Sequence, residues 1–233
     1  MKAFATLLAK ETKALFSSPI AYAVIAVYLL LVGYTFTAAL FITRMATLVH
    51  IFFQASVLLL LIIPIITMRQ FSEERKSGTL ELLLTAPVRE FTIVLAKFGA
   101  SMAVVLVMVA LTASYAVVLA VYGNPDLGPI YSGYLGLVLL GSALTALGLV
   151  ISALTANQIV AAVVSLGLFS LLWMLDSVAA LLPDPFDSFL ISLSLLAHFT
   201  PLATGAMYAS NFGFFLSVTL LGLFLTVRAL ARR

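Results

Sequence analysis

The sequence contains no cysteine and only two histidines, and charged residues make up 9% of its 233 positions. Without cysteine, the chain can form no disulfide, thiolate nucleophile or cysteine metal site. It contains no GxxxxGK[ST] motif, and therefore no recognisable phosphate-binding loop of its own. It also has no basic tract suited to nucleic acid. Hydrophobic residues make up 64% of the chain, which indicates an integral membrane protein.

Six apolar runs are long enough to cross a membrane, because about 20 apolar residues in a helix span the hydrocarbon core. Turn signals such as Gly123-Asn124-Pro125-Asp126 separate some of them. We therefore expect an all-α integral membrane protein with six transmembrane helices and a single domain over residues 1–233. The expected spans are 20–41, 48–68, 91–122, 128–154, 159–182 and 210–227.

Two further segments are predicted to be helical without crossing the membrane. Residues 1–18 mix leucine and phenylalanine with lysine at spacings typical of a helix in the membrane interface, and the alternative is a frayed cytoplasmic tail. Residues 183–208 contain an apolar run that is too short to cross, between proline-containing breaks. We expect this second segment to form a partly re-entrant pair of short helices on the outer face.

The positive charges predict the orientation of the spans. With six spans, all 12 lysine and arginine residues except Arg44 fall on the side of the N-terminus, and this side is the cytoplasm by the positive-inside rule. Both termini are then cytoplasmic, and Asp126, Asp184 and Asp187 lie outside. Lys97, near the start of the third span, is expected to extend its ammonium group to the interface.

Residues 71–88 form the longest charged segment, FSEERKSGTLELLLTAPV, and must face water or protein because charges are costly in hydrocarbon. Helical spacing places Glu74, Ser77, Gly78 and Glu81 in one polar stripe. We predict two short helices on the membrane surface, broken at Ser77-Gly78-Thr79, with Thr79 capping the second helix. Pro87 would end that helix. The alternative is a solvated loop that binds nothing.

The motif EERKSGTLELLLTAP at residues 73–87 resembles the signature of permease subunits of type-2 ABC exporters, and is most similar to the gliding-motility-associated branch. This resemblance implies that residues 71–88 are the cytoplasmic coupling helix, which docks onto a separate ATP-binding subunit. The residues to which it assigns docking are Glu73, Glu74, Arg75, Gly78, Thr79 and Glu81.

The resemblance also implies partners and a location. ATP and magnesium would be bound by the partner ATPase and no cofactor by this chain, which would not itself be an enzyme. A second permease copy or paralogue, membrane lipid and an extracytoplasmic accessory protein are the other expected partners, in a prokaryotic cytoplasmic (inner) membrane.

Few residues in the spans are candidates for chemistry. His50 and His198 are expected near opposite membrane faces, and neither belongs to an HExxH pair. Asp176 is the one acid within an expected span, next to Trp173 near its outer end, and is a functional candidate or an interfacial aspartate reaching water. His198-Phe199 resembles a recurrent pair of the permease family. Asp176, His198 and Phe199 are therefore the candidate pathway or gate residues.

These observations favour an exporter permease that moves substrate by coupling to a separate ATPase. The alternatives are a non-transporting membrane anchor or mechanotransmission component, in gliding motility or periplasmic maturation, and an intramembrane enzyme. The enzyme is disfavoured because no catalytic set lies within one water-facing region.

Overall fold

The computed structural model describes residues 2–43, 46–85, 88–183 and 185–231. Throughout this part of the chain every regular element is an α-helix. The helices are α1 (Lys2–Ser17), α2 (Pro19–Thr43), α3 (Val49–Lys76), α4 (Thr79–Thr85), α5 (Glu90–Tyr122), α6 (Leu127–Leu154), α7 (Gln158–Ala179), α8 (Phe186–Leu193), α9 (Leu195–Thr204) and α10 (Ala209–Ala231).

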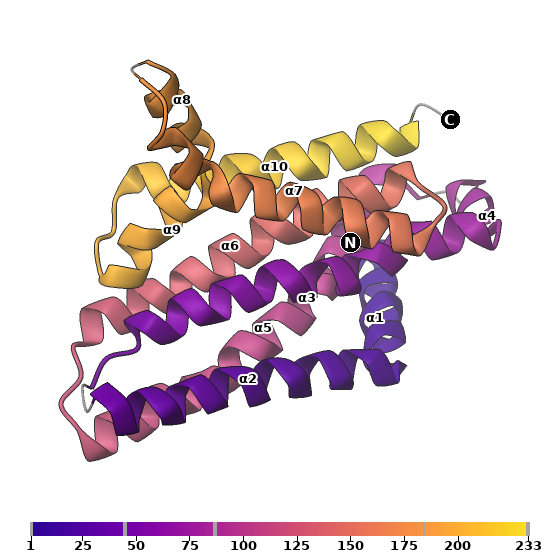
Figure 1. The fold of residues 1–233 in the computed structure, drawn as a ribbon. Helices are drawn as coiled ribbons and strands as arrows, with labels where there is room; N and C mark the ends of the chain where they lie inside the picture. The colour runs from indigo at the N-terminus through magenta and orange to yellow at the C-terminus, as the bar shows by residue number, and fades with distance from the viewer. Residues whose placement is uncertain (1, 44–45, 86–87, 184, 232–233) are drawn as a thin grey trace.

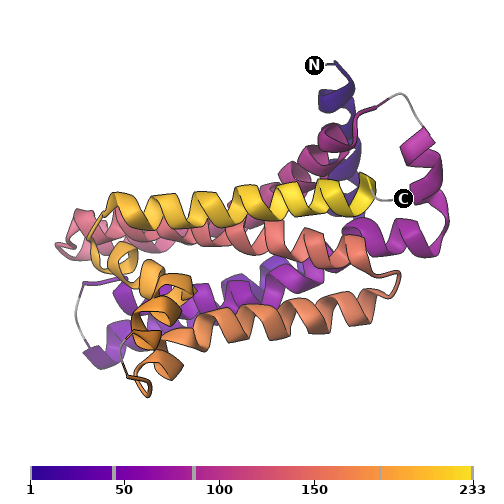
Figure 2. The same ribbon diagram turned by 90° about the horizontal axis from the view of Figure 1, so that it is seen from above.

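Six of these helices, α2, α3, α5, α6, α7 and α10, are long and apolar enough to cross a membrane. They form one elongated bundle, and α1 runs across its end (Figure 1). The helices α1 and α4 and the last turns of α10 lie at that end, here called the α4 end, whereas α8 and α9 lie at the opposite α9 end (Figures 1 and 2). The short pair α8 and α9 is bent by 65°.

Helix α6 lies at the centre of the bundle and packs against α3, α5, α7, α9 and α10. Small residues allow this close approach, as is usual between helices in lipid. A Cβ atom built on Gly141 would come 2.7 Å from Val105 of α5, and one built on Gly148 would overlap Thr67 of α3. Gly141 and Gly148 therefore lie on contact faces of α6.

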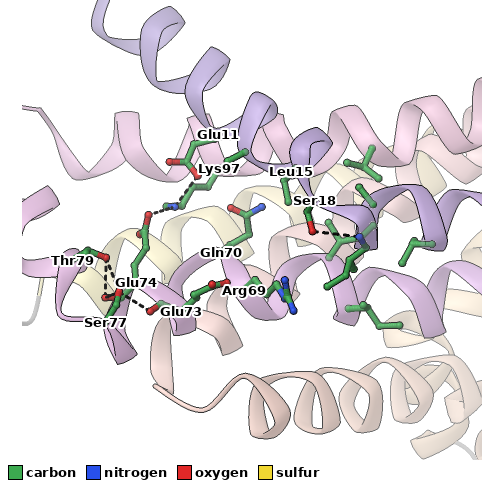
Figure 3. Close-up of a pocket in the computed structure, with 17 residues that line it drawn as sticks. Glu11, Leu15, Ser18, Arg69, Gln70, Glu73, Glu74, Ser77, Thr79 and Lys97 are labelled. Carbon is green, nitrogen blue, oxygen red and sulfur yellow. Dashed lines mark hydrogen bonds and ion pairs between the residues drawn. The ribbon is translucent and has the colours of Figure 1, made fainter.

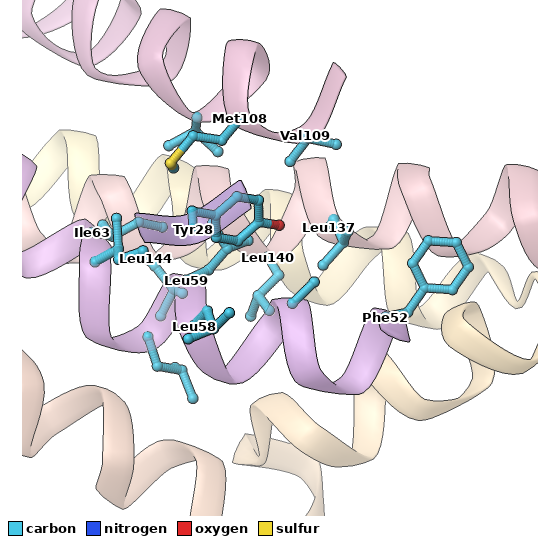
Figure 4. Packing of buried hydrophobic residues seen from close by; sticks show 14 of the residues in the cluster. Tyr28, Phe52, Leu58, Leu59, Ile63, Met108, Val109, Leu137, Leu140 and Leu144 are labelled. Carbon is cyan, nitrogen blue, oxygen red and sulfur yellow. The ribbon is translucent and has the colours of Figure 1, made fainter. Parts of the chain in front are cut away.

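The main apolar core lies where α2, α3, α5 and α6 meet (Figure 4). Tyr28, Leu59, Met108 and Leu140 from these four helices are each fully buried. Helices α2 and α7 expose most of their apolar surface, which suits lipid or another apolar partner.

The expected spans agree with the long helices to within a few residues at most ends, but two expectations are wrong. Helix α3 continues to Lys76 rather than ending near residue 68, so residues 71–76 extend a span instead of forming a separate surface helix. No glycine or proline interrupts 65–76, and α6 holds this extension on one side. Lys97 is 1% exposed, because two carboxylates bind it inside the protein. Predictions on Arg44, Pro87, Asp184, Arg232 and Arg233 lie outside the described residues.

Candidate functional site

The charged segment forms a helical corner at the α4 end. Gly78 adopts a left-handed conformation with φ of 72°, and its amide donates to the Arg75 carbonyl at 3.3 Å. The chain therefore changes direction between the end of α3 and the start of α4, where the sequence predicts a break. Thr79, predicted to cap α4, instead donates its hydroxyl to the Glu74 carbonyl at 3.3 Å and so closes the end of α3.

Ser152 of α6 anchors the extended part of α3. Its hydroxyl accepts hydrogen bonds from the amides of Phe71 (3.1 Å) and Ser72 (3.2 Å), and it donates to the Met68 carbonyl at 3.0 Å. The Ser72 hydroxyl donates in turn to the Ser152 carbonyl at 3.0 Å. One residue further on, Arg75 donates to the Ala153 carbonyl at 2.8 Å. These bonds fix the last two turns of α3 against α6.

A buried ion cluster joins three helices beside this anchor (Figure 3). Lys97 of α5 places its Nζ 3.0 Å from Glu11 of α1 and 2.8 Å from Glu74 of α3. The same ammonium lies 5.3 Å from the centre of the Phe71 ring. Because a buried charge is stable only when paired, the cluster ties α1, α3 and α5 together.

The six predicted docking residues lie in two different environments. Glu73, Gly78, Thr79 and Glu81 are exposed. Glu74 and Arg75 are half-buried, and their charged groups contact Lys97 and Ala153 within the chain. Helix α4 is anchored by Leu80, which is buried in a second apolar cluster with Phe71 and Leu149. Docking itself stays a prediction.

The predicted gate residues lie at the α9 end, apart from the charged corner. Phe199 is fully buried, with its ring 5.9 Å from that of Phe53 on α3 and 6.0 Å from that of Trp173 on α7. His198 stacks on Phe214 of α10 at 3.8 Å, and its Nδ1 lies 2.9 Å from the Ser194 carbonyl. Helix α9 is thus held against three long helices by aromatic contacts.

His50 and Asp176 lie in the first turn of α3 and the last turn of α7, respectively. His50 lies three residues before Phe53 on α3, so it shares the α9 end with His198, and the prediction of opposite faces is wrong. Asp176 is half-buried on α7, one turn from Trp173. Its carboxylate forms no ion pair or hydrogen bond with any described side chain.

Sequence reasoning missed Glu11, Lys97 and Ser152 as parts of the site. A lone lysine seven residues into a long apolar run was the available signal for Lys97, since an ionisable group at such a position normally has a partner. Nothing in the sequence marks Glu11, which is 86 positions from Lys97.

Comparison with known protein families gives a match. A family described as ABC-2 family transporter protein matches residues 5–230, nearly the whole chain. No curated protein matches the chain at a significant level.

Proposed function

The chain belongs to the ABC-2 family of transporter proteins, and from this premise we propose that it is the permease subunit of an ATP-driven exporter. Permeases of this family pair in general with an ATP-binding subunit. The ATP and magnesium would be held by that subunit, and substrate would pass along the permease in a cytoplasmic (inner) membrane.

The observation that carries this proposal is the helical corner at the end of α3. A soluble ATPase can move membrane helices only through a rigid element that contacts both. The corner meets this need, because it is exposed on one side and tied to α6 by Ser152 on the other. We infer that residues 71–88 are the coupling segment, with α4 as its outermost part.

The six docking candidates would then divide into two roles. Glu73, Gly78, Thr79 and Glu81 are exposed and would contact the ATPase. Glu74 and Arg75 are engaged within the chain, so they would position the corner rather than touch the partner.

The proposal places the α4 end in the cytoplasm and the α9 end outside. There the bent pair α8 and α9 would be the partly re-entrant segment, with Phe199, His198 and Asp176 as gate or pathway residues. A second permease copy or paralogue would complete the pathway, against the apolar surfaces that α2 and α7 leave exposed.

Affinity purification tests the coupling role. We expect the tagged chain to retain an ATP-binding cassette subunit in detergent, and Glu81→Lys to lower the affinity for this subunit at least about tenfold by reversing an exposed charge. Asp187→Lys is the matched control, because it makes the same charge change on α8 at the α9 end. Size-exclusion chromatography of each variant verifies that folding is intact.

Three results would contradict the proposal in different ways. Equal loss of the ATPase in both variants would remove the assignment of the docking face to α4. If no ATPase were retained in several detergents, the coupling assignment would fail. If the ATPase were retained but vesicles showed no ATP-dependent flux, the chain would instead be a non-transporting anchor or mechanotransmission component.

A further inference from the structure

A cavity of about 460 Å³ lies at the α4 end, between α1, α2, α3 and α5 (Figure 3). Its volume falls in the range of small-molecule sites in proteins, roughly 300–1,000 Å³. It borders the ion cluster of Lys97, Glu11 and Glu74 without being filled by it. The cavity therefore has room for a bound molecule beside a set of fixed charges.

The lining is divided into a polar and an apolar part. Charged and amide groups from the last turns of α3 line one part, whereas the apolar part is lined by Ile20 and Val24 of α2, Ile65 and Ile66 of α3, and Val104 of α5. Ile65 is also 37% exposed within the apolar part of α3, so the apolar lining reaches the surface of the bundle at this residue. That surface faces lipid in a membrane-spanning protein. The cavity thus fits an amphiphile whose chain enters from the bilayer.

The polar part contains groups that have no partner among the described residues. Gln70 is 5% exposed, and its amide forms no hydrogen bond there. Figure 3 shows this amide projecting from α3 into the space that Lys97 and Leu15 border. Glu74 Oε2 and Arg69 Nε are buried and also lack a partner. Buried polar groups of native proteins normally have partners, so unpaired ones lining a cavity point to a ligand.

These unpaired groups specify the chemistry of that ligand. Glu74 Oε2 and the Gln70 carbonyl oxygen are acceptors suited to a primary ammonium group. Arg69 is a donor suited to a phosphate. The cavity is lined by three carboxylates against two cations, and Lys97 is already bound by Glu11 and Glu74. This balance disfavours a purely anionic ligand.

We propose that the cavity binds the head group of an ethanolamine-type phospholipid, with its ammonium at Glu74 and Gln70 and its phosphate at Arg69. One acyl chain lies along the wall of Ile20, Val24 and Ile65. A choline head group carries the same net charge but no N–H donor, so it leaves the two acceptors unpaired. This site is independent of the transport proposal, because it needs neither an ATPase nor movement of substrate.

Native mass spectrometry of the purified, delipidated full chain tests this site. We expect dioctanoyl phosphatidylethanolamine to bind at least about tenfold more tightly than dioctanoyl phosphatidylcholine or phosphatidylglycerol. Arg69→Gln and Gln70→Leu should each weaken that binding about tenfold. Arg228→Gln is the matched control, because this arginine is in the last turn of α10 and does not line the cavity. It should leave binding unchanged.

Other results overturn the proposal. Equal binding of the choline and ethanolamine lipids removes the role of the unpaired acceptors. If free O-phosphoethanolamine binds as tightly as the lipid, the ligand is a small soluble compound and not a membrane lipid. A photoreactive phosphatidylethanolamine tests the unmodified chain, in case the variants fold poorly. It should label peptides that contain Ile65 or Gln70, and labelling confined to other helices counts against the site.

Discussion

We predict that Lys97→Met destabilises the α4 end of the bundle by about 3 kcal/mol. The lysine side chain is 1% exposed and is the ammonium partner of both Glu11 and Glu74, at 3.0 and 2.8 Å. Removing one member of a buried ion pair costs about 3–5 kcal/mol, since the remaining charge is left without compensation. The Glu74 side chain is 21% exposed, so water can solvate its carboxylate after the lysine is removed. We therefore expect the loss of free energy of unfolding to lie at the lower limit of this range.

The assay is thermal unfolding of the purified chain in detergent. For a chain of this size, a loss of about 3 kcal/mol lowers the apparent Tm by roughly 6–12 °C. Lys76→Met is the matched control, because Lys76 is an exposed lysine at the end of α3 without an ion pair to a described residue. Its Tm should stay within about 2 °C of the parent, as is usual for exposed positions.

A compensated variant separates the charge effect from a packing effect. Combining Lys97→Met with Glu11→Gln and Glu74→Gln removes all three charges, and a neutral network of similar volume should recover most of the lost stability. Equal Tm values for Lys97→Met and Lys76→Met would refute the reasoning. So would a combined variant that is no more stable than Lys97→Met alone.

Two more substitutions test the other contacts. Ser152→Ala removes the acceptor of the Phe71 and Ser72 amides and should lower the free energy of unfolding by about 1–3 kcal/mol. The substitution should also speed hydrogen exchange more in residues 68–76 than in α10. Unchanged exchange would refute the anchoring role. Phe199→Ala removes a fully buried ring and should lower the free energy of unfolding by about 3–5 kcal/mol. It should also shift the fluorescence emission of Trp173, the only tryptophan, to the red. An unshifted emission with Phe199→Ala, or a full shift with Phe199→Leu, would count against the packing described.

The sequence predicts the six long helices because unbroken apolar runs and turn signals are local properties. It predicts the break at Gly78 for the same reason, since glycine readily adopts the positive φ found there. It does not predict that α3 continues to Lys76. In that extension, the Ser72 amide donates a hydrogen bond to the hydroxyl of Ser152 on α6, which is 80 positions away in the sequence. The polarity of residues 71–76 alone predicts a separate surface helix, and it cannot reveal such contacts with a distant part of the chain.

The sequence also predicts the location of the candidate site but not the contacts of its side chains. The motif identifies the segment and its exposed residues, such as Glu73 and Glu81, but it does not separate them from Glu74 and Arg75. The difference arises from Lys97 and Ala153, which lie on other helices and bind these two side chains. A charge pattern in one segment cannot reveal partners that reach it only after the helices pack.

The two ends of the bundle are held by different forces, and this difference bears on which end moves more easily. The α4 end is tied by a buried ion cluster and by hydrogen bonds, whose loss is costly because charges and donors are left unpaired. The α9 end is held by aromatic contacts between rings around Phe199 and His198, whose loss leaves no charge unpaired. Helix α8 buries no residue at all among those described. We therefore expect α8 to repack while α1, α3 and α5 move together at the α4 end. The hydrogen-exchange measurement above tests this on the parent chain, where amides of α8 should exchange faster than those of residues 68–76.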